Sequence, residues 1–149
     1  MTIKENEARG REIERIVAAK ICGSASPSRR WLYDVETGDA ILEVKSCKVK
    51  TKGYKTATGQ YMQTGRFFIL VNSHRRLKEK AVEMAKEPKY VFVVYDLVKD
   101  RLKVVRMKTV SHETVSSLLS NRKVYTRTDG LKLVGIRHTQ IFEDHILCA

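Results

Sequence analysis

Two stretches of the chain place apolar residues three or four positions apart, as on one face of an α-helix. The first predicts a helix over about residues 5–21, with the apolar stripe Ile13, Ile16, Val17 and Ile21. The second predicts a helix over 74–86 that ends before Pro88, because proline has no backbone N–H to donate. A shorter helix is expected from Ser111, a suitable N-cap residue, to Leu119.

Short apolar runs between these helices predict β-strands. The runs cover residues 30–36, 40–45, 67–71, 90–97 and 102–105. Thr37-Gly38-Asp39 has the composition of a turn, so the first two runs are expected to form an antiparallel hairpin. The runs at 67–71 and 90–97 are apolar enough for strands that are buried on both faces.

The remaining segments are more polar. Residues 24–28, which contain a proline, are expected to form a loop, and the basic stretch 46–58 is expected to be an exposed, mobile loop. Residues 59–65 are expected to form a short helix. Asp129-Gly130 is a strong hairpin signal between apolar residues on either side, and it predicts a hairpin near the end of the chain.

The order helix, hairpin, strand, helix, strand is typical of an α/β fold, with a mixed β-sheet core flanked by helices. The chain has 149 residues, of which 42% are hydrophobic, and this is the size of a single domain with one core. We therefore expect one domain over 1–149, with its core at about 5–97 and an added C-terminal β-hairpin region at about 98–149.

The chain is strongly basic. Lys and Arg number 29 against 17 Asp and Glu, giving a formal net charge of +12, which implies a polyanionic partner such as nucleic acid. No apolar run approaches the roughly 18 residues of a membrane span, and the first residues lack the apolar core of a signal peptide. The three cysteines are odd in number and form no CxxC pair, so we expect a cytoplasmic, reducing location rather than disulfides or a zinc cluster.

Candidate chemistry lies in the first hairpin. Alternation along its second strand places Ile41, Glu43 and Lys45 on one face. The first strand carries Asp34, and pairing across the turn can bring its carboxylate next to Glu43. Asp39 is a competing candidate for this carboxylate, although its position in the turn favours Asp34.

Two convergent carboxylates suit a hard cation such as Mg²⁺, which neutralises charge and activates water in phosphodiester hydrolysis. A neighbouring lysine can orient the attacking water or stabilise charge on the phosphoryl oxygens. Glu87-Pro88-Lys89 has the same E-x-K spelling, but it lies at a predicted helix end without a strand or an upstream acid. The alternative for Glu43 and Lys45 is a simple surface ion pair on an exposed strand.

These residues carry a family resemblance. Asp34 and the triplet Glu43-Val44-Lys45 resemble the motif of the PD-(D/E)xK nuclease superfamily, although Tyr33 replaces the motif's proline. Arg9-Gly10 followed by Glu14, and then Ser28-Arg29-Arg30, make the first half of the chain look most like the archaeal Holliday-junction resolvases. From about Leu97 onward the chain resembles nothing that we can place.

The resemblance implies a restriction-endonuclease-like fold and a role for each matched residue. Asp34 and Glu43 would be metal ligands, the Val44 carbonyl a backbone ligand, Lys45 the base that positions water, and Glu14 a supporting carboxylate. Gln60 and Gln63 follow the motif strand, where related nucleases often place a glutamine near the metal. The basic residues around the site are expected to bind phosphates; they are Arg29, Arg30, Lys48, Lys50, Lys52 and Lys55.

The sequence therefore predicts a DNA endonuclease that uses Mg²⁺ or Mn²⁺. Its substrate is expected to be duplex or branched DNA, and cutting both strands with one site per chain favours a homodimer or a higher homo-oligomer. A junction resolvase and a sequence-specific restriction or homing endonuclease are both compatible with the motif. A non-catalytic nucleic-acid-binding module is the alternative from a different class.

Overall fold

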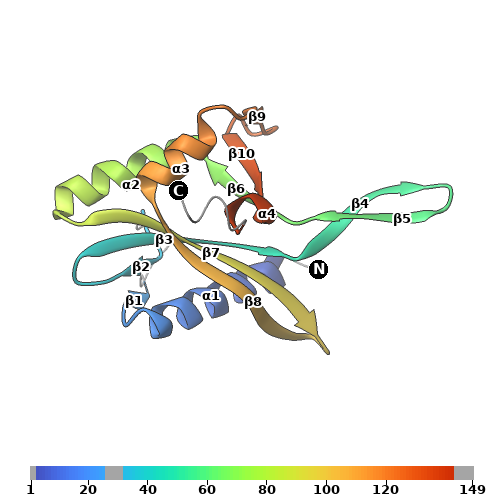
Figure 1. The fold of residues 1–149 in the computed structure, drawn as a ribbon, viewed down its shortest axis with the longest axis horizontal. Coiled ribbons are helices and arrows are strands. Elements are labelled where there is room, and N and C mark those ends of the chain that lie inside the picture. Colours follow the sequence, from blue (N-terminus) through green and yellow to red (C-terminus); the bar gives the residue numbers. More distant parts are fainter. Residues whose placement is uncertain (1–2, 26–31, 143–149) are drawn as a thin grey trace.

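A computed structural model describes residues 3–25 and 32–142. A five-stranded mixed sheet forms its centre, with the strand order β1-β2-β3-β7-β8 (Figure 1). Its strands are β1 (Ser24–Ala25), β2 (Val35–Glu36), β3 (Ala40–Lys48), β7 (Glu87–Val98) and β8 (Arg101–Ser111). β3 and β7 are parallel, and the other neighbouring pairs are antiparallel.

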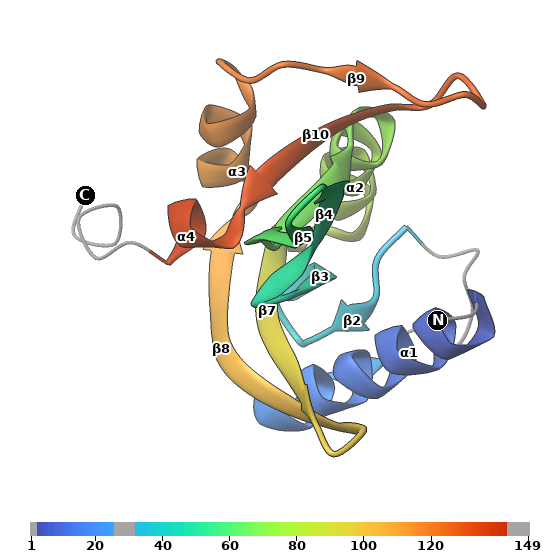
Figure 2. The same ribbon diagram turned by 90° about the vertical axis from the view of Figure 1, so that its right-hand side faces the viewer.

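Helices cover both faces of this sheet, as side-chain alternation along β3 requires. On one face, Ile13 and Val17 of α1 (Ile3–Lys20) pack with Ala40 and Leu42. The opposite face carries Ile41 of β3 and lies under α2 (Val71–Met84) and α3 (His112–Leu119) (Figure 2). The α/β class and the helices expected at 5–21, 74–86 and 111–119 are therefore confirmed.

A smaller sheet with the order β6-β10-β9 packs over the second face. It consists of β6 (Arg66–Leu70), β10 (Lys132–Arg137) and β9 (Tyr125–Thr126), and the short helix α4 (His138–Ile141) follows it. The expected hairpin at Asp129-Gly130 joins β9 to β10, and Gly130 supplies the positive φ of +88° that this turn uses. This C-terminal hairpin is confirmed, and through β10 it pairs with β6.

The prediction for residues 46–65 was wrong. β3 continues to Lys48, and the segment expected to be a mobile loop contains β4 (Lys50–Thr56). The expected short helix at 59–65 is β5 (Gly59–Thr64), which pairs with β4 alone in a two-stranded hairpin that extends away from the body (Figure 1). Thr, Tyr and Lys residues in this segment suit a solvated two-stranded ribbon. The apolar pattern that predicts strands appears only where a strand has a buried face, so it did not indicate this hairpin.

Three strand predictions need smaller corrections. Only Val35–Glu36 of the expected strand at 30–36 is a strand, while its first residues, 30–31, lie outside the described residues. Part of the expected loop at 24–28 is the strand β1, which pairs with β2. The strand at 67–71 is buried on one face only, because Phe68 is 56% exposed. Within the described ranges, no helix is long and apolar enough to cross a membrane.

Candidate active site

Asp34 is fixed against the central strand β3 by two hydrogen bonds. Its backbone N–H donates to the Leu42 carbonyl at 2.9 Å, which continues the β2–β3 ladder by one residue. Its Oδ2 accepts a hydrogen bond of 2.8 Å from the Val44 N–H. The carboxylate thus accepts a hydrogen bond from the β3 backbone, as the next residue of a longer β2 would do. Asp34 is therefore held beside Glu43-Val44-Lys45, immediately before β2.

Lys86 stabilises the turn that brings Asp34 to this position. Its ammonium lies 3.0 Å from Oε2 of Glu36 and 2.6 Å from the Thr37 carbonyl oxygen. Tyr33 donates a hydrogen bond of 2.7 Å to the other oxygen of Glu36. The hairpin expected from Thr37-Gly38-Asp39 is therefore anchored to the start of β7, and the position of Asp34 follows from it.

Glu43 and Lys45 extend from the same face of β3, as strand alternation predicted. Lys45 Nζ lies 3.1 Å from Glu43 Oε1, and the two side chains are only 21% and 16% exposed. The other oxygen, Glu43 Oε2, is buried and has no hydrogen-bond partner among the described residues. A buried carboxylate oxygen without a partner is costly, so this atom is suited to ligate a cation.

The electrostatics around Asp34 favour a cation at the same place. The pKa of Asp34 is raised to about 7; burial is the main cause, the carboxylates Glu14 and Glu43 add to it, and the Val44 N–H and Lys45 oppose it. Glu14 reaches the site from α1, on the opposite side of the sheet from α2. Negative groups that raise one another's affinity for a proton also raise the affinity for a metal ion.

The Val44 carbonyl points to the same side of β3 as the Asp34 carboxylate. The Leu42 carbonyl accepts from the Asp34 N–H, and the Val44 N–H donates to the Asp34 carboxylate. In a strand, the N–H and C=O of one residue point toward the same neighbouring strand. The Val44 C=O is therefore directed toward the β2 side of the strand, where Asp34 lies. This gives the site a third oxygen besides the two carboxylates.

These donors fit a hard divalent cation. No group of three or more His, Cys, Asp and Glu side chains forms a metal cage within residues 3–25 and 32–142. Mg²⁺ does not require such a cage, because it commonly binds to one or two carboxylates and keeps several waters. Asp34, Glu43 and the Val44 carbonyl would hold such an ion, and their oxygen-only chemistry does not suit zinc.

A partly buried network of polar side chains begins beside Glu43 on the neighbouring strand. Tyr90 lies beside Glu43 in the β3–β7 register, and its hydroxyl is 2.7 Å from Nδ1 of His74 on α2. The other ring nitrogen of His74 is 2.8 Å from Ser116 Oγ on α3, and the ring stacks on His112 at 3.8 Å. No role was predicted for these histidines, because His74 is separated along the chain by 38 residues from His112 and by 42 residues from Ser116.

The structure does not bring every predicted residue to the site. Asp39 is exposed in the turn, where the Thr37 hydroxyl donates to it at 2.9 Å, so Asp34 rather than Asp39 lies against Val44. Gln60 and Gln63 lie on β5, and Gln60 donates to the Gly53 carbonyl of the same hairpin. Gln63 pairs with Thr51, which follows Glu43 by eight residues. Eight residues of extended strand span up to about 26 Å, so the pairing places Gln63 along the hairpin and not beside Glu43.

The predicted phosphate-binding residues spread along the strand and the hairpin. Lys48 ends β3 and is half-buried, and Lys50 begins β4 and is exposed. Lys52 and Lys55 belong to β4, where they pair with Met62 and Gln60. Arg29 and Arg30 lie outside the described residues.

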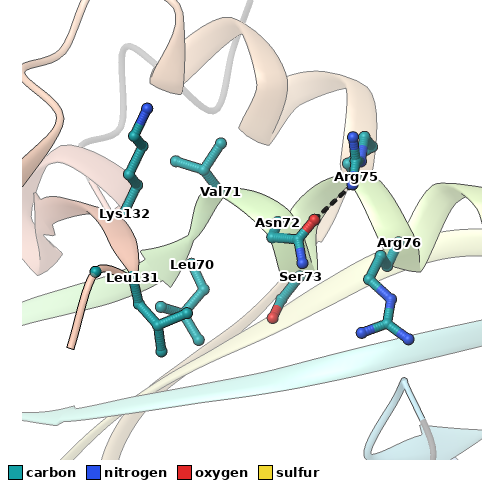
Figure 3. A pocket seen from close by; sticks show the side chains of 9 residues that line it. Leu70, Val71, Asn72, Ser73, Arg75, Arg76, Leu131 and Lys132 are labelled. Atoms are coloured by element: carbon teal, nitrogen blue, oxygen red, sulfur yellow. Dashed lines mark hydrogen bonds between the residues drawn. The ribbon is translucent and has the colours of Figure 1, made fainter. Parts of the chain in front are cut away.

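One basic pocket was not predicted. It has a volume of about 480 Å³ and lies where β6 passes into α2, facing the start of β10 (Figure 3). Arg75 and Arg76 of α2 and Lys132 of β10 line it. The adjacent arginines at the start of the helix predicted over 74–86 were the one sequence feature that could have indicated this pocket. Nothing in the sequence showed that Lys132 lies beside them.

A comparison with protein families identifies the superfamily of the chain. A model described as a PD-(D/E)XK nuclease superfamily domain matches residues 1–138. The chain belongs to this superfamily. The restriction-endonuclease-like fold is thereby confirmed, and the match continues beyond Leu97, where the recognisable motifs end. The match does not show the closer similarity to archaeal Holliday-junction resolvases, and no curated protein and no solved structure matches the chain.

Proposed function

We propose that this nuclease is a Mg²⁺- or Mn²⁺-dependent endonuclease that hydrolyses phosphodiester bonds of DNA. The observation that carries the proposal is the grouping around Val44: its N–H donates to the Asp34 carboxylate, and Glu43 beside it has a buried oxygen without a hydrogen-bond partner in the described part of the chain. Superfamily membership and the net charge of +12 support a nucleic-acid substrate. The described cysteines, Cys22 and Cys47, are free, which supports a cytoplasmic location.

In this proposal Asp34, Glu43 and the Val44 carbonyl would hold the metal ion, which would act as a Lewis acid and lower the pKa of bound water. Lys45 lies 3.1 Å from Glu43, close enough to orient the attacking water or to bind a phosphoryl oxygen. Glu14 adds negative charge from α1 and strengthens the attraction for the cation. Lys48, Lys50, Lys52 and Lys55, together with Arg29 and Arg30, would bind the DNA backbone without reading its sequence.

The test compares Glu43→Gln with Glu87→Gln on supercoiled plasmid and on a labelled four-way junction, with Mg²⁺, with Mn²⁺ or with EDTA. Glu87 is a matched control, because Lys89 Nζ lies 3.4 Å from its Oε2 in the other E-x-K triplet, which the structure places at the start of strand β7 and not, as expected, at a helix end without a strand. We expect metal-dependent cleavage that is lost in Glu43→Gln and retained in Glu87→Gln. Equal cleavage by both variants would contradict the proposed site.

The same assay separates the finer alternatives. Symmetric cuts in the junction, without cleavage of linear duplex, would identify a junction resolvase, whereas cleavage at one sequence in a random library would identify a restriction or homing enzyme. Salt-sensitive binding without metal-dependent cleavage of any substrate would indicate a non-catalytic binding module. We propose a homodimer as the active form, since each chain carries one site, and sedimentation at the assay concentration tests it.

A further inference from the structure

The outer face of the small sheet exposes an aromatic ring. Along β6, Phe67 and Ile69 are buried against the central sheet, so alternation places Arg66, Phe68 and Leu70 on the outer face. Phe68 is 56% exposed, whereas Phe67 is fully buried. The Phe68 ring is therefore accessible to a binding partner, whereas the Phe67 ring is not.

Gly135 determines how the Phe68 ring lies. The two residues are direct partners in the β6–β10 register. A Cβ at position 135 would lie 3.3 Å from Cε1 of Phe68 and 3.7 Å from Cδ of Arg66. The ring and the arginine stem therefore both lie over the glycine, side by side on the outer face. With no side chain at 135 to hold the ring upright, Phe68 lies across β10 and leaves one face open to solvent.

Two arginines form the next pair along the same face, on one side of this ring. Arg66 and Arg137 are direct partners in the same register, and like charges opposite each other destabilise an antiparallel pair. Among residues 3–25 and 32–142, neither arginine forms an ion pair with a carboxylate. An anion placed between them would remove this repulsion.

The same face leads into the basic pocket. Leu70 shares the outer face with Phe68 and also lines the pocket, together with the apolar side chains of Val71 and Leu131 (Figure 3). Arg75, Arg76 and Lys132 add positive charge at its rim, and Arg75 donates a hydrogen bond of 2.6 Å to Asn72 Oδ1. An open aromatic ring, an apolar wall and basic side chains thus follow one another along a single surface, and among these basic side chains Arg75 also lies 3.7 Å from Oε1 of Glu79.

We propose that this outer face binds unpaired nucleotides of a DNA strand, with a base stacked on Phe68 and the adjoining phosphates held by Arg66 and Arg137. Bases in an intact duplex are already stacked on both sides, so only an unpaired base can offer its face to the ring. A second copy of the chain fits less well, because a two-fold contact would bring the same arginines together. The proposal rests on the proposed nuclease function and adds that the substrate contains an unpaired segment.

The test measures DNA binding without cleavage, in EDTA, by fluorescence anisotropy. The probes are a labelled 20-nucleotide oligo-dT and a blunt duplex of the same length. The variants are Phe68→Leu, which keeps an apolar side chain but removes the ring, and Phe68→Trp, which keeps a ring. Val82→Ala is the matched control, since Val82 on α2 is 74% exposed and lies outside this face.

We expect Phe68→Leu to weaken oligo-dT binding about ten-fold or more, with less than about two-fold change for the duplex. Phe68→Trp should retain the affinity, and its indole emission should be quenched by oligo-dT. Equal losses for both probes, or no loss for oligo-dT, would overturn the proposal. A shift of Phe68→Leu to a smaller species in sedimentation, with unchanged oligo-dT affinity, would overturn it in favour of an interface between copies.

Failure of this proposal is distinguishable from failure of the nuclease assignment. Glu43→Gln should bind oligo-dT like the wild type even though it does not cut. If no variant cuts DNA but the ring still decides binding of unpaired strands, the face is confirmed and the catalytic proposal is wrong. If cleavage is metal-dependent and Phe68→Leu binds both probes like the wild type, the catalytic proposal is supported and the proposal for the outer face is wrong.

Discussion

Replacing Asp34 by asparagine should make the metal-free protein more stable and at the same time inactive. The wild-type carboxylate is buried beside Glu14 and Glu43, and its pKa is raised from 3.8 to about 7. The folded protein therefore holds a proton at Asp34 more tightly than the unfolded chain does. As the pH rises from about 4 to about 7, the unfolded chain ionises at this residue while the folded protein keeps the proton, so the free energy of unfolding falls, and above about pH 7 the penalty is constant.

The size of this effect follows from the pKa. Each pKa unit corresponds to about 1.4 kcal/mol, so the penalty at pH 8 is about 4 kcal/mol. An amide keeps an acceptor for the Val44 N–H, but this neutral hydrogen bond is weaker by about 1 kcal/mol. Asp34→Asn should therefore raise the free energy of unfolding at pH 8 by about 2–3 kcal/mol. For a domain of this size, that corresponds to an increase in Tm of about 5–10 °C.

The measurement is urea unfolding in EDTA at pH 8 and pH 5, with Asp96→Asn as a control that removes the same charge from an exposed position on β7. The gain should fall below about 1 kcal/mol at pH 5, where less of the penalty has developed. Adding Mg²⁺ or Mn²⁺ should stabilise the wild type but not Asp34→Asn. The reasoning is refuted if the variant is no more stable than the wild type at pH 8, or if its gain is the same at both pH values.

Four further predictions concern other parts of the molecule. Lys45→Met should reduce single-turnover cleavage by about 10²–10⁴-fold while metal-dependent stabilisation persists, and loss of both would point to a structural role. Leu77→Ala, at a fully buried position on α2, should lower the free energy of unfolding in urea by about 2–5 kcal/mol. Gly65→Ala should lower it by more than about 3 kcal/mol, because its Cβ would lie 1.8 Å from the Lys48 carbonyl oxygen, and a smaller loss would show that the backbone there can move. Burial, with a contribution from His112, lowers the pKa of His74 to about 4, so the stability from neutral His74 is fully present above about pH 6.5 and is lost as the pH falls toward 4. We expect a loss of about 1–2 kcal/mol after solvent screening, and His74→Asn should make unfolding between pH 7 and pH 4.5 less pH-dependent.

The elements with a buried face were predictable from the sequence. The stripe on α1 and the apolar runs of β3 and β7 reflect burial against the two faces of the central sheet, and burial is what hydrophobic patterns record. The β4–β5 hairpin leaves no such record, because both of its faces are polar. The run at 67–71 suggested burial on two faces because periodicity does not show whether an apolar residue such as Phe68 contacts protein or solvent.

The centre of the candidate site was predictable for a different reason. Glu43 and Lys45 are two residues apart on one strand, and Asp34 lies across a short hairpin, so local geometry alone brings them together. Features that depend on distant parts of the chain could not be found in this way. The partnership of Phe68 with Gly135 arises only when β6 pairs with β10, and that of Tyr90 with His74 only when α2 packs on the central sheet.

The parallel pairing of β3 with β7 has a consequence for when the enzyme becomes able to act. The strand that carries Glu43 obtains its second neighbour only after the chain has been synthesised through Val98 and α2 has crossed between the two strands. Contacts between residues so far apart in sequence form late and slowly in folding. An incomplete chain emerging from the ribosome would therefore hold its charged triplet on an unsupported hairpin. A chain that ends before β7 therefore lacks the pairing that completes the central strand of the candidate site.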